Sequence, residues 1–401
     1  MPRTGGKPDG SLNGDRVLEA ARGLQRWAVD HALPLWGTAG FDRDRGRFEE
    51  RLTLDGARIR DVPIRLMVQA RQIHSYGMAA RRRWYGGAQA LVEAAFGSMV
   101  RDFHRRDGGG GWIFSIRRDG RIEDPRRDLY AHAFVLLAVA SYVQTTARSE
   151  ALALADSTLA YLDAEFRAPQ GGGFVDAVPA VDAIRRQNPH MHMLEGLLAL
   201  WRASGNEVYL TRARQMVDLF RSRFFQPGRG VLVEYFDAHL KPLAGPLGEV
   251  VEPGHHYEWI WLLRWFERET GEDVQAHVDA LYAHADANGH DGHGLIVDEL
   301  LASGATRDGR HRAWPVTEAI KANLVEAAAN RPGAAEKAVA LIGTLQDRFL
   351  ASTPAGGWMA GGWMDRLDKD GNPATDFMPA STLYHVLGVL DELARAGALT
   401  R

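Results

Sequence analysis

The sequence has no cysteine among its 401 residues. This absence excludes disulfide bonds, thiolate nucleophiles and zinc sites built from cysteine ligands. Long apolar runs are also missing, since no uninterrupted stretch approaches the roughly 20 residues that a membrane-spanning helix needs. The first residues, MPRTGGKPDGSLNGD, lack the apolar core of a secretory signal. We therefore expect a soluble, cytoplasmic protein with no membrane partner.

The chain also has no large excess of charge of either sign. It contains 48 basic and 51 acidic residues, a net charge of -3, and the two signs are interspersed. Such a surface offers no basic field for nucleic acid or for an anionic membrane. Apolar residues make up 45% of the chain, which is ample for a large core. Residues 1–14 are rich in Gly, Pro and charge, so we expect a disordered tail there and a single domain over 15–401.

A Gly-containing segment followed by a large apolar residue occurs six times, at intervals of about 60 residues. In five of the six, a carboxylate stands two or three positions later. The spacing matches a repeated unit of two helices and a loop, so the length does not require a second domain. Several segments continue to a turn signal such as RDG or DKDG, which predicts short β-hairpins. The apolar anchors are Phe48, Trp112, Phe174, Val231, Leu295 and Trp363.

Between these segments the apolar spacing is helical. The stretch after Asp15 carries an apolar stripe at Val17, Ala21, Leu24 and Ala28, whereas runs such as AHAFVLLAVASYV are apolar nearly all round. Stripe-bearing helices alternate with wholly apolar ones, as in a ring whose inner helices are surrounded by outer helices. The sequence therefore predicts an all-α (α/α)6 barrel, with about twelve helices in six hairpin pairs and the β-hairpins on the active-site side.

A second repeat consists of polar residues near the start of each expected inner helix. They recur at the same interval of about 60 residues, and equal positions on helices around one axis converge at one end of a barrel. Six distant regions of the chain are thus expected to build one pocket. The six residues are Arg71, His132, His192, His255, Glu318 and His385.

The segment PGHHYEWIWLL places His255 and Glu258 three residues apart on one helix face. At that spacing the carboxylate can orient the imidazole ring and raise its basicity. The alternative is that both residues only stabilise the start of a helix. Among the other candidates, Arg71 has the phase of the histidines, and a cavity-facing arginine must be paired or must meet a ligand oxygen.

The segment NPHMHMLEGLLAL carries His190 and His192 at the opening of an apolar helix. A pair of this type can bind metal, but no third ligand is clustered nearby, so we expect His192 to line the pocket and no metal to bind. Asn188 is either a helix cap or a hydroxyl-binding amide.

Tyr130 and His132 precede another apolar helix, where a lone histidine is as often a core residue as a ligand-binding one. Trp314 stands before a helix start and offers a flat face for a sugar ring, and Glu318 follows in the first turn, where it is also an ordinary helix-start residue. His385 stands at the start of the last expected inner helix. A second histidine from a distant part of the chain suits acid–base chemistry.

Five short motifs carry these residues in a fixed order. They are QAR (Arg71), MHMLE (His192), PGHHYE (His255 and Glu258), WPVTEA (Trp314 and Glu318) and YH (His385). In this order and spacing they resemble the N-acylglucosamine 2-epimerase superfamily, which includes mannose isomerase and cellobiose 2-epimerase. The resemblance covers about residues 15–395.

The resemblance implies an (α/α)6 barrel that acts on an open-chain monosaccharide without metal or cofactor. It implies that His255 and His385 act as general base and acid on carbon 2 and its neighbours, with Glu258 supporting His255. Arg71 and His192 would hold the carbonyl and hydroxyl oxygens. Three further residues match positions that line the sugar site, namely Asn188, Tyr130 and Trp314.

The NPHMH and PASTLYH segments are most similar to the mannose isomerase branch of this superfamily. We therefore expect an aldose–ketose isomerase that acts on D-mannose or a related aldose such as D-lyxose, through a histidine-mediated proton transfer and an enediolate. A sugar 2-epimerase remains open, because the same residues can return the proton to the opposite face of carbon 2. The sequence leaves open a monomer or a homodimer.

Two other classes fit less well. A glycoside hydrolase on the same toroid needs a pair of inward carboxylates, which Glu258 and Glu318 would have to supply, yet histidines outnumber carboxylates at the shared phase. A non-catalytic binding protein has no use for three histidines and an arginine in one cavity.

Overall fold

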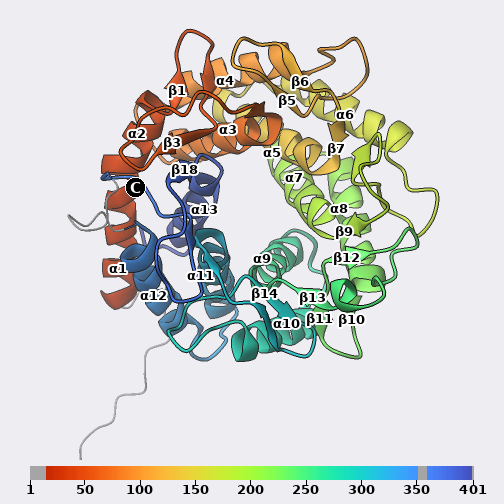
Figure 1. Ribbon diagram of the computed structural model, residues 1–401, viewed down its shortest axis with the longest axis vertical. Coiled ribbons are helices and arrows are strands. Elements are labelled where there is room, and N and C mark those ends of the chain that lie inside the picture. The colour runs from red at the N-terminus through yellow and green to blue at the C-terminus, as the bar shows by residue number, and fades with distance from the viewer. Residues whose placement is uncertain (1–14, 351–358, 400–401) are drawn as a thin grey trace, which may run out of the picture.

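The computed structural model describes residues 15–350 and 359–399, and these form a ring of helices in two concentric layers (Figure 1). Within these residues six helical positions line the axis and six surround them, so the predicted (α/α)6 barrel is confirmed. The expected disordered tail, 1–14, lies outside the described residues.

The inner helices are buried on nearly every side, which explains why their sequences are apolar all round. The His192 helix, for example, has twelve buried residues in a row from its second position onward. The inner helices are α3 (Leu66–Arg81), α5 (Leu129–Thr146), α7 (Asn188–Ser204), α9 (Pro253–Thr270), α11 (Ala313–Ala328) and α13 (Thr382–Arg395).

The outer helices bury one stripe, and in the first of them the stripe residues Val17, Ala21, Leu24 and Ala28 are all buried, as predicted. Three outer positions contain a π-helical segment. The first outer position comprises α1 (Asp15–Arg26), η1 (Trp27–Ala32) and α2 (Leu33–Thr38), and the others are α4 (Ala88–Phe103), η2 (Ser149–Ala151) with α6 (Leu152–Glu165), α8 (Glu207–Leu219) with η3 (Phe220–Phe224), α10 (Gln275–Asn288), and α12 (Ala334–Leu345) with η5 (Gln346–Leu350).

Among the described helices, α5 is long and apolar enough to cross a membrane by length and composition alone. It is an inner helix, however, and 78% of its apolar window is buried inside the ring. Its composition therefore follows from its place in the core.

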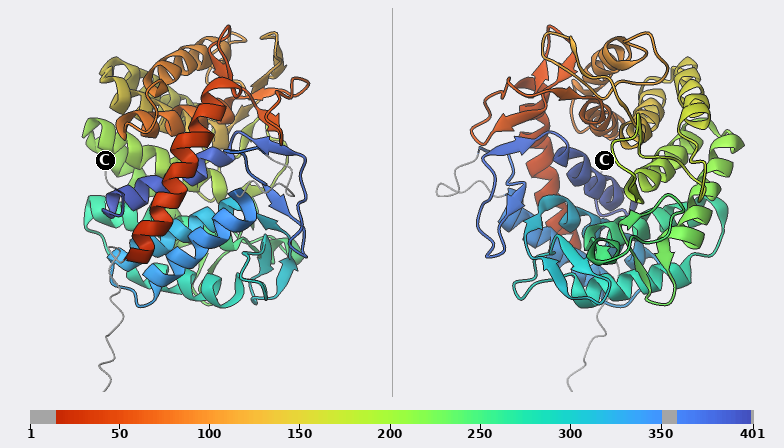
Figure 2. Two further views of the ribbon diagram at one scale, coloured as in Figure 1. Left: turned by 90° about the vertical axis from the view of Figure 1, so that its left-hand side faces the viewer. Right: turned by 45° about the vertical axis from the view of Figure 1, so that its right-hand side comes forward.

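The strands gather at one end of the barrel (Figure 2) and connect neighbouring repeats. Each strand that precedes an inner helix pairs with a strand of the following repeat, rather than only with its own hairpin. The inter-repeat pairs are β4 (Ile64–Arg65) with β5 (Ser115–Ile116), β7 (Arg127–Asp128) with β8 (Ala177–Val178), β9 (Arg185–Arg186) with β12 (Tyr235–Phe236), β13 (Val250–Val251) with β14 (Glu299–Leu301), β16 (His311–Arg312) with β17 (Arg366–Leu367), and β18 (Phe377–Pro379) with β3 (Arg51–Thr53).

The last of these pairs closes the ring, because β18 belongs to the final repeat and β3 to the first. Expected hairpins are present as well, for example β5 with β6 (Ile122–Asp124) and β14 with β15 (Thr306–Asp308). The remaining short elements are β1 (Phe41–Asp42), β2 (Arg47–Phe48), β10 (Phe225–Gln226), β11 (Val231–Leu232) and the 3-10 turn η4 (Pro246–Glu249).

The glycine of each repeat has a physical reason. Just before each anchor, the chain turns through a glycine with positive φ, between 64° and 82°, which side chains disfavour. These glycines are Gly46, Gly111, Gly173, Gly230, Gly294 and Gly361. In four repeats the backbone N–H that follows is then bound by a side chain from the first turn of the inner helix. The pairs are Phe48 with Gln69, Trp112 with His132, Phe174 with His190 and Leu232 with His256.

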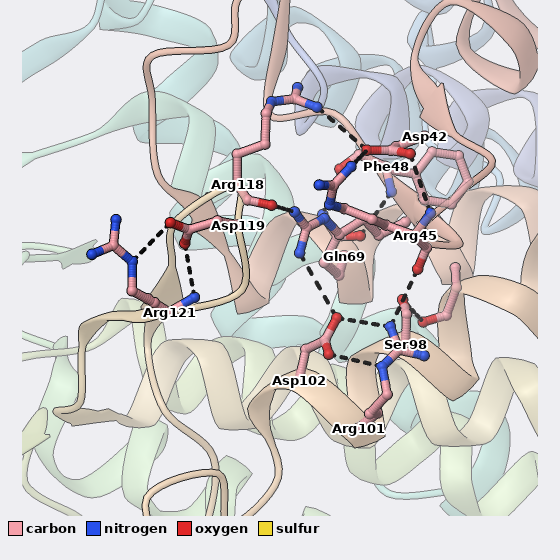
Figure 3. Close-up of polar contacts among 12 residues, drawn as sticks. Asp42, Arg45, Phe48, Gln69, Ser98, Arg101, Asp102, Arg118, Asp119 and Arg121 are labelled. Carbon is pink, nitrogen blue, oxygen red and sulfur yellow. Dashed lines mark hydrogen bonds and ion pairs between the residues drawn. The ribbon is translucent and has the colours of Figure 1, made fainter.

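The first of these contacts lies in a polar cluster that joins the first two repeats (Figure 3). The N–H of Phe48 donates to Gln69 Oε1 over 2.9 Å, and Gln69 Nε2 donates back to the Phe48 carbonyl over 2.9 Å. Arg118, at the tip of the next hairpin, contacts Asp42 at 3.3 Å. Side chains thus tie these loops to the inner helices, which positions the helix starts for a shared site.

Candidate active site

A cavity of about 140 Å³ lies where the first turns of the inner helices meet. It adjoins a larger, mainly apolar cleft of about 590 Å³, with which it shares Tyr130 and Asn188. Eight of the ten site residues predicted from the sequence line the smaller cavity. Its lining is Arg71, Tyr130, Asn188, His192, Glu252, His255, Glu258, Arg312, Trp314 and His385.

His255 stands in the first turn of α9 and is 5% exposed. Its Nδ1 lies 3.0 Å from Glu234 Oε1 and 4.0 Å from Glu252 Oε2. Burial lowers the pKa of His255, but Glu234, Glu252 and Glu258 outweigh it and raise the pKa to about 9. His255 is therefore an imidazolium at neutral pH. The carboxylate nearest to its ring nitrogen is Glu234, so the predicted contact of His255 with Glu258 is not formed, although Glu258 does raise the pKa of His255 as predicted.

Glu234 is itself held in place. Its Oε2 accepts from Gln187 Nε2 at 3.0 Å, and Gln187 Oε1 accepts from Trp259 Nε1 at 2.7 Å. A hydrogen-bonded carboxylate behind a histidine fixes the orientation of the ring and stabilises its protonated form. The signal for Glu234 was present in the sequence, since it is the carboxylate of the fourth Gly-containing repeat.

His385, in the first turn of α13, has the opposite environment. Its Nδ1 lies 2.7 Å from Glu318 Oε1, and its Nε2 lies 3.4 Å from Arg71 Nη1. Burial, together with the positive charges of Arg71 and Lys321, outweighs Glu318 and lowers the pKa of His385 to about 4. His385 is therefore neutral at physiological pH. Glu318 does not line the cavity but lies directly behind His385.

His192 and Glu258 face each other across the cavity, with Nε2 and Oε1 4.0 Å apart. The Nδ1 of His192 lies 3.0 Å from Glu195 Oε2, and burial lowers the pKa of His192 to about 4 despite that carboxylate. Burial and the charge of Glu318 raise the pKa of Glu258 well above its usual value. A protonated Glu258 and a neutral His192 can both hydrogen-bond a sugar hydroxyl.

Arg71 supplies the positive charge of the cavity. Its Nη2 donates to the hydroxyl of Tyr130, and its guanidinium lies 4.3 Å from the ring centre of Phe134 and 4.9 Å from that of Tyr384. Among the described residues, no carboxylate lies within ion-pair distance of Arg71. This arginine can therefore bind a substrate oxygen that gains negative charge.

Trp314 forms the flat wall between the two histidines. Its ring centre lies 5.0 Å from that of His255 and 5.8 Å from that of His385. A side chain at Gly254 would meet the Trp314 ring at 2.6 Å, so glycine permits this close approach. Asn188, the first residue of α7, lines the same cavity, with its Oδ1 buried and unbonded.

His132 and His190 lie outside the cavity, which corrects the expectation that His132 binds the sugar. His132 Nε2 accepts from the N–H of Trp112 at 3.2 Å, and His190 Nε2 accepts from the N–H of Phe174 at 3.0 Å. Because the Nε2 of His190 already accepts a hydrogen bond from the loop of its own repeat, His190 and His192 form no metal-binding pair. In this repeat Phe134, two residues after His132, occupies the helix position that corresponds to Arg71 and His192 in their own repeats.

A family model described as N-acylglucosamine 2-epimerase (GlcNAc 2-epimerase) matches residues 46–389. The chain belongs to this family. The mannose-6-phosphate isomerase of Rhizobium meliloti (strain 1021) is 32% identical over 379 residues, which cover 92% of this chain and 95% of that protein. The D-mannose isomerase of Thermobifida fusca is 29% identical over 262 residues, or 60% of this chain and 63% of its own length.

The structure of the cellobiose 2-epimerase from Bacillus thermoamylovorans B4167 has the same fold, with a TM-score of 0.82 at 19% identity over 94% of this chain and 99% of that one. The protein is thus a sugar isomerase or epimerase of the N-acylglucosamine 2-epimerase family. Because the family name and these relatives include both reactions, the residues of the cavity must be used to choose between them.

Two sets each hold three side chains whose possible metal-ligand atoms lie within 4.8 Å of one another. The first consists of Glu234, Glu252 and His255, and the second of Glu258, Glu318 and His385. Each set already contains a carboxylate paired with a side-chain cation. Arg312 Nη2 lies 2.9 Å from Glu252 Oε2, and Lys321 Nζ lies 2.6 Å from Glu318 Oε2. We therefore assign no metal to either set.

Proposed function

We propose that the enzyme is an aldose–ketose isomerase that interconverts D-mannose, or a related aldose such as D-lyxose, with its ketose through an enediolate. The observation that supports this most directly is that two histidines on one cavity have opposite surroundings. Glu234 and Glu252 lie beside His255 and raise its pKa to about 9, whereas burial and the charge of Arg71 help to lower the pKa of His385 to about 4. Groups whose environments separate their pKa values in this way are suited to serve as acid and base.

The proposed steps follow from these states. His385 Nε2 removes the proton from carbon 2 of the open-chain aldose, while Arg71 stabilises the oxygen on carbon 1 and His255 protonates that oxygen. The enediol then takes the proton of His385 at carbon 1 and returns the proton of its second hydroxyl to His255. The charge environment thus makes His385 the base and His255 the acid, the reverse of the roles that the family resemblance implied.

The separation of the two pKa values also favours isomerisation over epimerisation. In the isomerase cycle each histidine regains its own resting state after every turnover. An epimerase that used His385 on one face and His255 on the other would end with the proton moved from His255 to His385. Since one pKa unit corresponds to about 1.4 kcal/mol, that exchanged state is strongly disfavoured here.

The cavity further favours a sugar without a phosphate group. Among the described residues, the cavity has one guanidinium group besides that of Arg71, and it belongs to Arg312. Arg312 Nη2 lies 2.9 Å from Glu252 Oε2, and its Nε lies 2.7 Å from Asp298 Oδ1. A phosphate would compete with these carboxylates and face Glu252. The small volume of the cavity, about 140 Å³, suits a single neutral sugar.

We expect incubation with D-mannose in heavy water to give the ketose as the main product, with deuterium at carbon 1. The label enters because His385 carries the proton between carbons 2 and 1 and exchanges it with solvent. Product separation and NMR would measure both. Glucose labelled at carbon 2, with little ketose, would instead establish a 2-epimerase. In a parallel incubation, mannose 6-phosphate should react at least ~10-fold more slowly, because Arg312 in the cavity is already paired with Glu252 and Asp298.

We expect kcat/KM to be highest between two pH limits. Below the pKa of His385, about 4, the base takes up a proton and activity falls. Above the pKa of His255, about 9, the acid loses its proton and activity falls again. Initial rates in overlapping buffers would test this bell shape. A Glu234→Gln variant should move only the alkaline limit, to lower pH, and an unchanged alkaline limit would remove His255 as the acid.

A further inference from the structure

A buried lysine lies behind the catalytic base. Lys321 stands on α11, one turn after Glu318, and is 1% exposed. Its Nζ lies 2.6 Å from Glu318 Oε2 and 3.6 Å from the ring centre of Trp261. A buried ammonium group is strongly disfavoured unless it is paired, so its retention in the barrel core calls for a role. The reaction steps above make no use of it.

The contacts form a line from Lys321 to the cavity. Glu318 bridges Lys321 and His385, with Oε1 2.7 Å from His385 Nδ1. On the far side of the ring, Nε2 lies 3.4 Å from Arg71 Nη1. An arginine can only donate, so Nε2 must offer a lone pair, and Nδ1 must then carry the proton and donate it to Glu318. That tautomer requires an ionised Glu318.

Lys321 interacts electrostatically with three buried carboxylates, those of Glu195, Glu258 and Glu318. Glu195 is stabilised by His192 and by the hydroxyl of Tyr384, whereas Glu258 Oε1 has no hydrogen-bond partner. Lys321 makes its ion pair with Glu318. The negative charge therefore settles on Glu318, while the pKa of Glu258 is raised.

We propose that Lys321 is a positioning residue for the isomerase proposed above: it keeps Glu318 ionised, and Glu318 fixes the tautomer of His385 that presents the Nε2 lone pair to carbon 2. This role rests on the proposed function only for the identity of the substrate carbon. The other charged and titratable groups that face this line come from α3, α5, α7, α9 and α13, and they include Arg71, His74, Tyr130, Glu195, His255, Glu258 and Tyr384.

Replacing Lys321 with methionine is expected to move the acidic limit of kcat upward by at least ~1 pH unit, because an adjacent cation depresses uptake of a proton by the Glu318–His385 pair by about that amount. A proton on His385 Nε2 occupies the lone pair, and a proton on Glu318 reverses the tautomer of His385. Either proton therefore removes the lone pair from the cavity. The matched control is Lys337→Met, since Lys337 on α12 pairs with Asp286 at the same 2.6 Å but belongs to the outer layer. Its acidic limit should equal that of the wild type.

The double variant Lys321→Met/Glu318→Gln keeps the experiment decisive if the single variant does not fold, because it removes both buried charges. Its kcat and pH profile should match those of Glu318→Gln alone within ~3-fold. An unchanged acidic limit in folded Lys321→Met, or a further loss of ~10-fold in the double variant, would show that Lys321 only stabilises the core.

A second measurement separates this inference from the proposed reaction. In protein with ¹⁵N-labelled histidine, the His385 signals, assigned with His385→Gln, should show an unprotonated Nε2 that takes up its proton at higher pH in Lys321→Met. If the wild type converts no aldose, the proposed function fails, and the NMR titration still decides the role of Lys321. A protonated Nε2 in the wild type would overturn it.

Discussion

Replacing either His385 or His255 with glutamine is expected to lower kcat by at least ~10²-fold, because general acid–base catalysis contributes about that factor. Glutamine keeps a hydrogen-bonding group beside Glu318 or Glu234 but cannot exchange a proton. Initial rates with D-mannose, together with the melting temperature of each variant, would measure the effect. A variant that kept more than a tenth of the wild-type kcat would lose its assignment as acid or base.

The matched control for these variants is His132→Gln. His132 is a buried histidine at a helix start, as His385 is, but it accepts a hydrogen bond from the N–H of Trp112. Gln69 makes the same contact to Phe48 in the first repeat, so glutamine is a natural substitute. We expect His132→Gln to retain kcat within ~3-fold. An equal loss in this variant would mean that the histidine substitutions act through the fold.

The Arg71→Met variant is expected to lose ~10² to 10³-fold in kcat, which is the usual effect of removing one group that stabilises a developing oxyanion. Methionine replaces the guanidinium group that lies over Phe134 and Tyr384 with a flexible apolar side chain, so the packing should survive. The kcat of Arg71→Lys should lie between those of the wild type and Arg71→Met, because lysine keeps the positive charge but lacks the planar guanidinium group.

Steady-state kinetics with D-mannose would separate two roles for Arg71. A loss in kcat indicates that the arginine acts in the transition state, whereas a rise in KM alone would limit it to substrate binding. The control is Arg81→Met, at the opposite end of the same helix, for which we expect wild-type kcat and KM.

The fold and most of the cavity were predictable because the repeat fixes the phase of the inner helices. Once the Gly-containing segments define the repeat, residues such as Arg71, His192 and His385 must converge at one end of the ring. The phase did not distinguish His132 from its neighbour Phe134, since a histidine that binds a backbone N–H has the same sequence context as one that faces a cavity. Which of these two residues faces the cavity depends on where the inner helix begins, and the sequence repeat does not locate that start closely enough to separate positions two residues apart.

Contacts between distant segments were not predictable in the same way. The spacing of His255 and Glu258 allowed a contact on one helix, but Glu234 arrives from the preceding loop and takes that place. Lys321 was missed although it is three residues from Glu318, because local spacing does not tell an exposed lysine from one buried in a barrel core. Partners of buried charges are set by packing, which sequence periodicity does not encode.

The pairing of β18 with β3 bears on how the protein is made in the cell. A linear array of repeats can gain stability as each unit leaves the ribosome, but this ring has no finished interface between its first and last repeats until Phe377–Pro379 has been synthesised. His385 lies beyond that strand, so the chemistry also awaits the synthesis of α13. Nascent chains that stop short of α13 would expose the apolar sides of α3 and α11, which makes them substrates for chaperones rather than partly active enzymes.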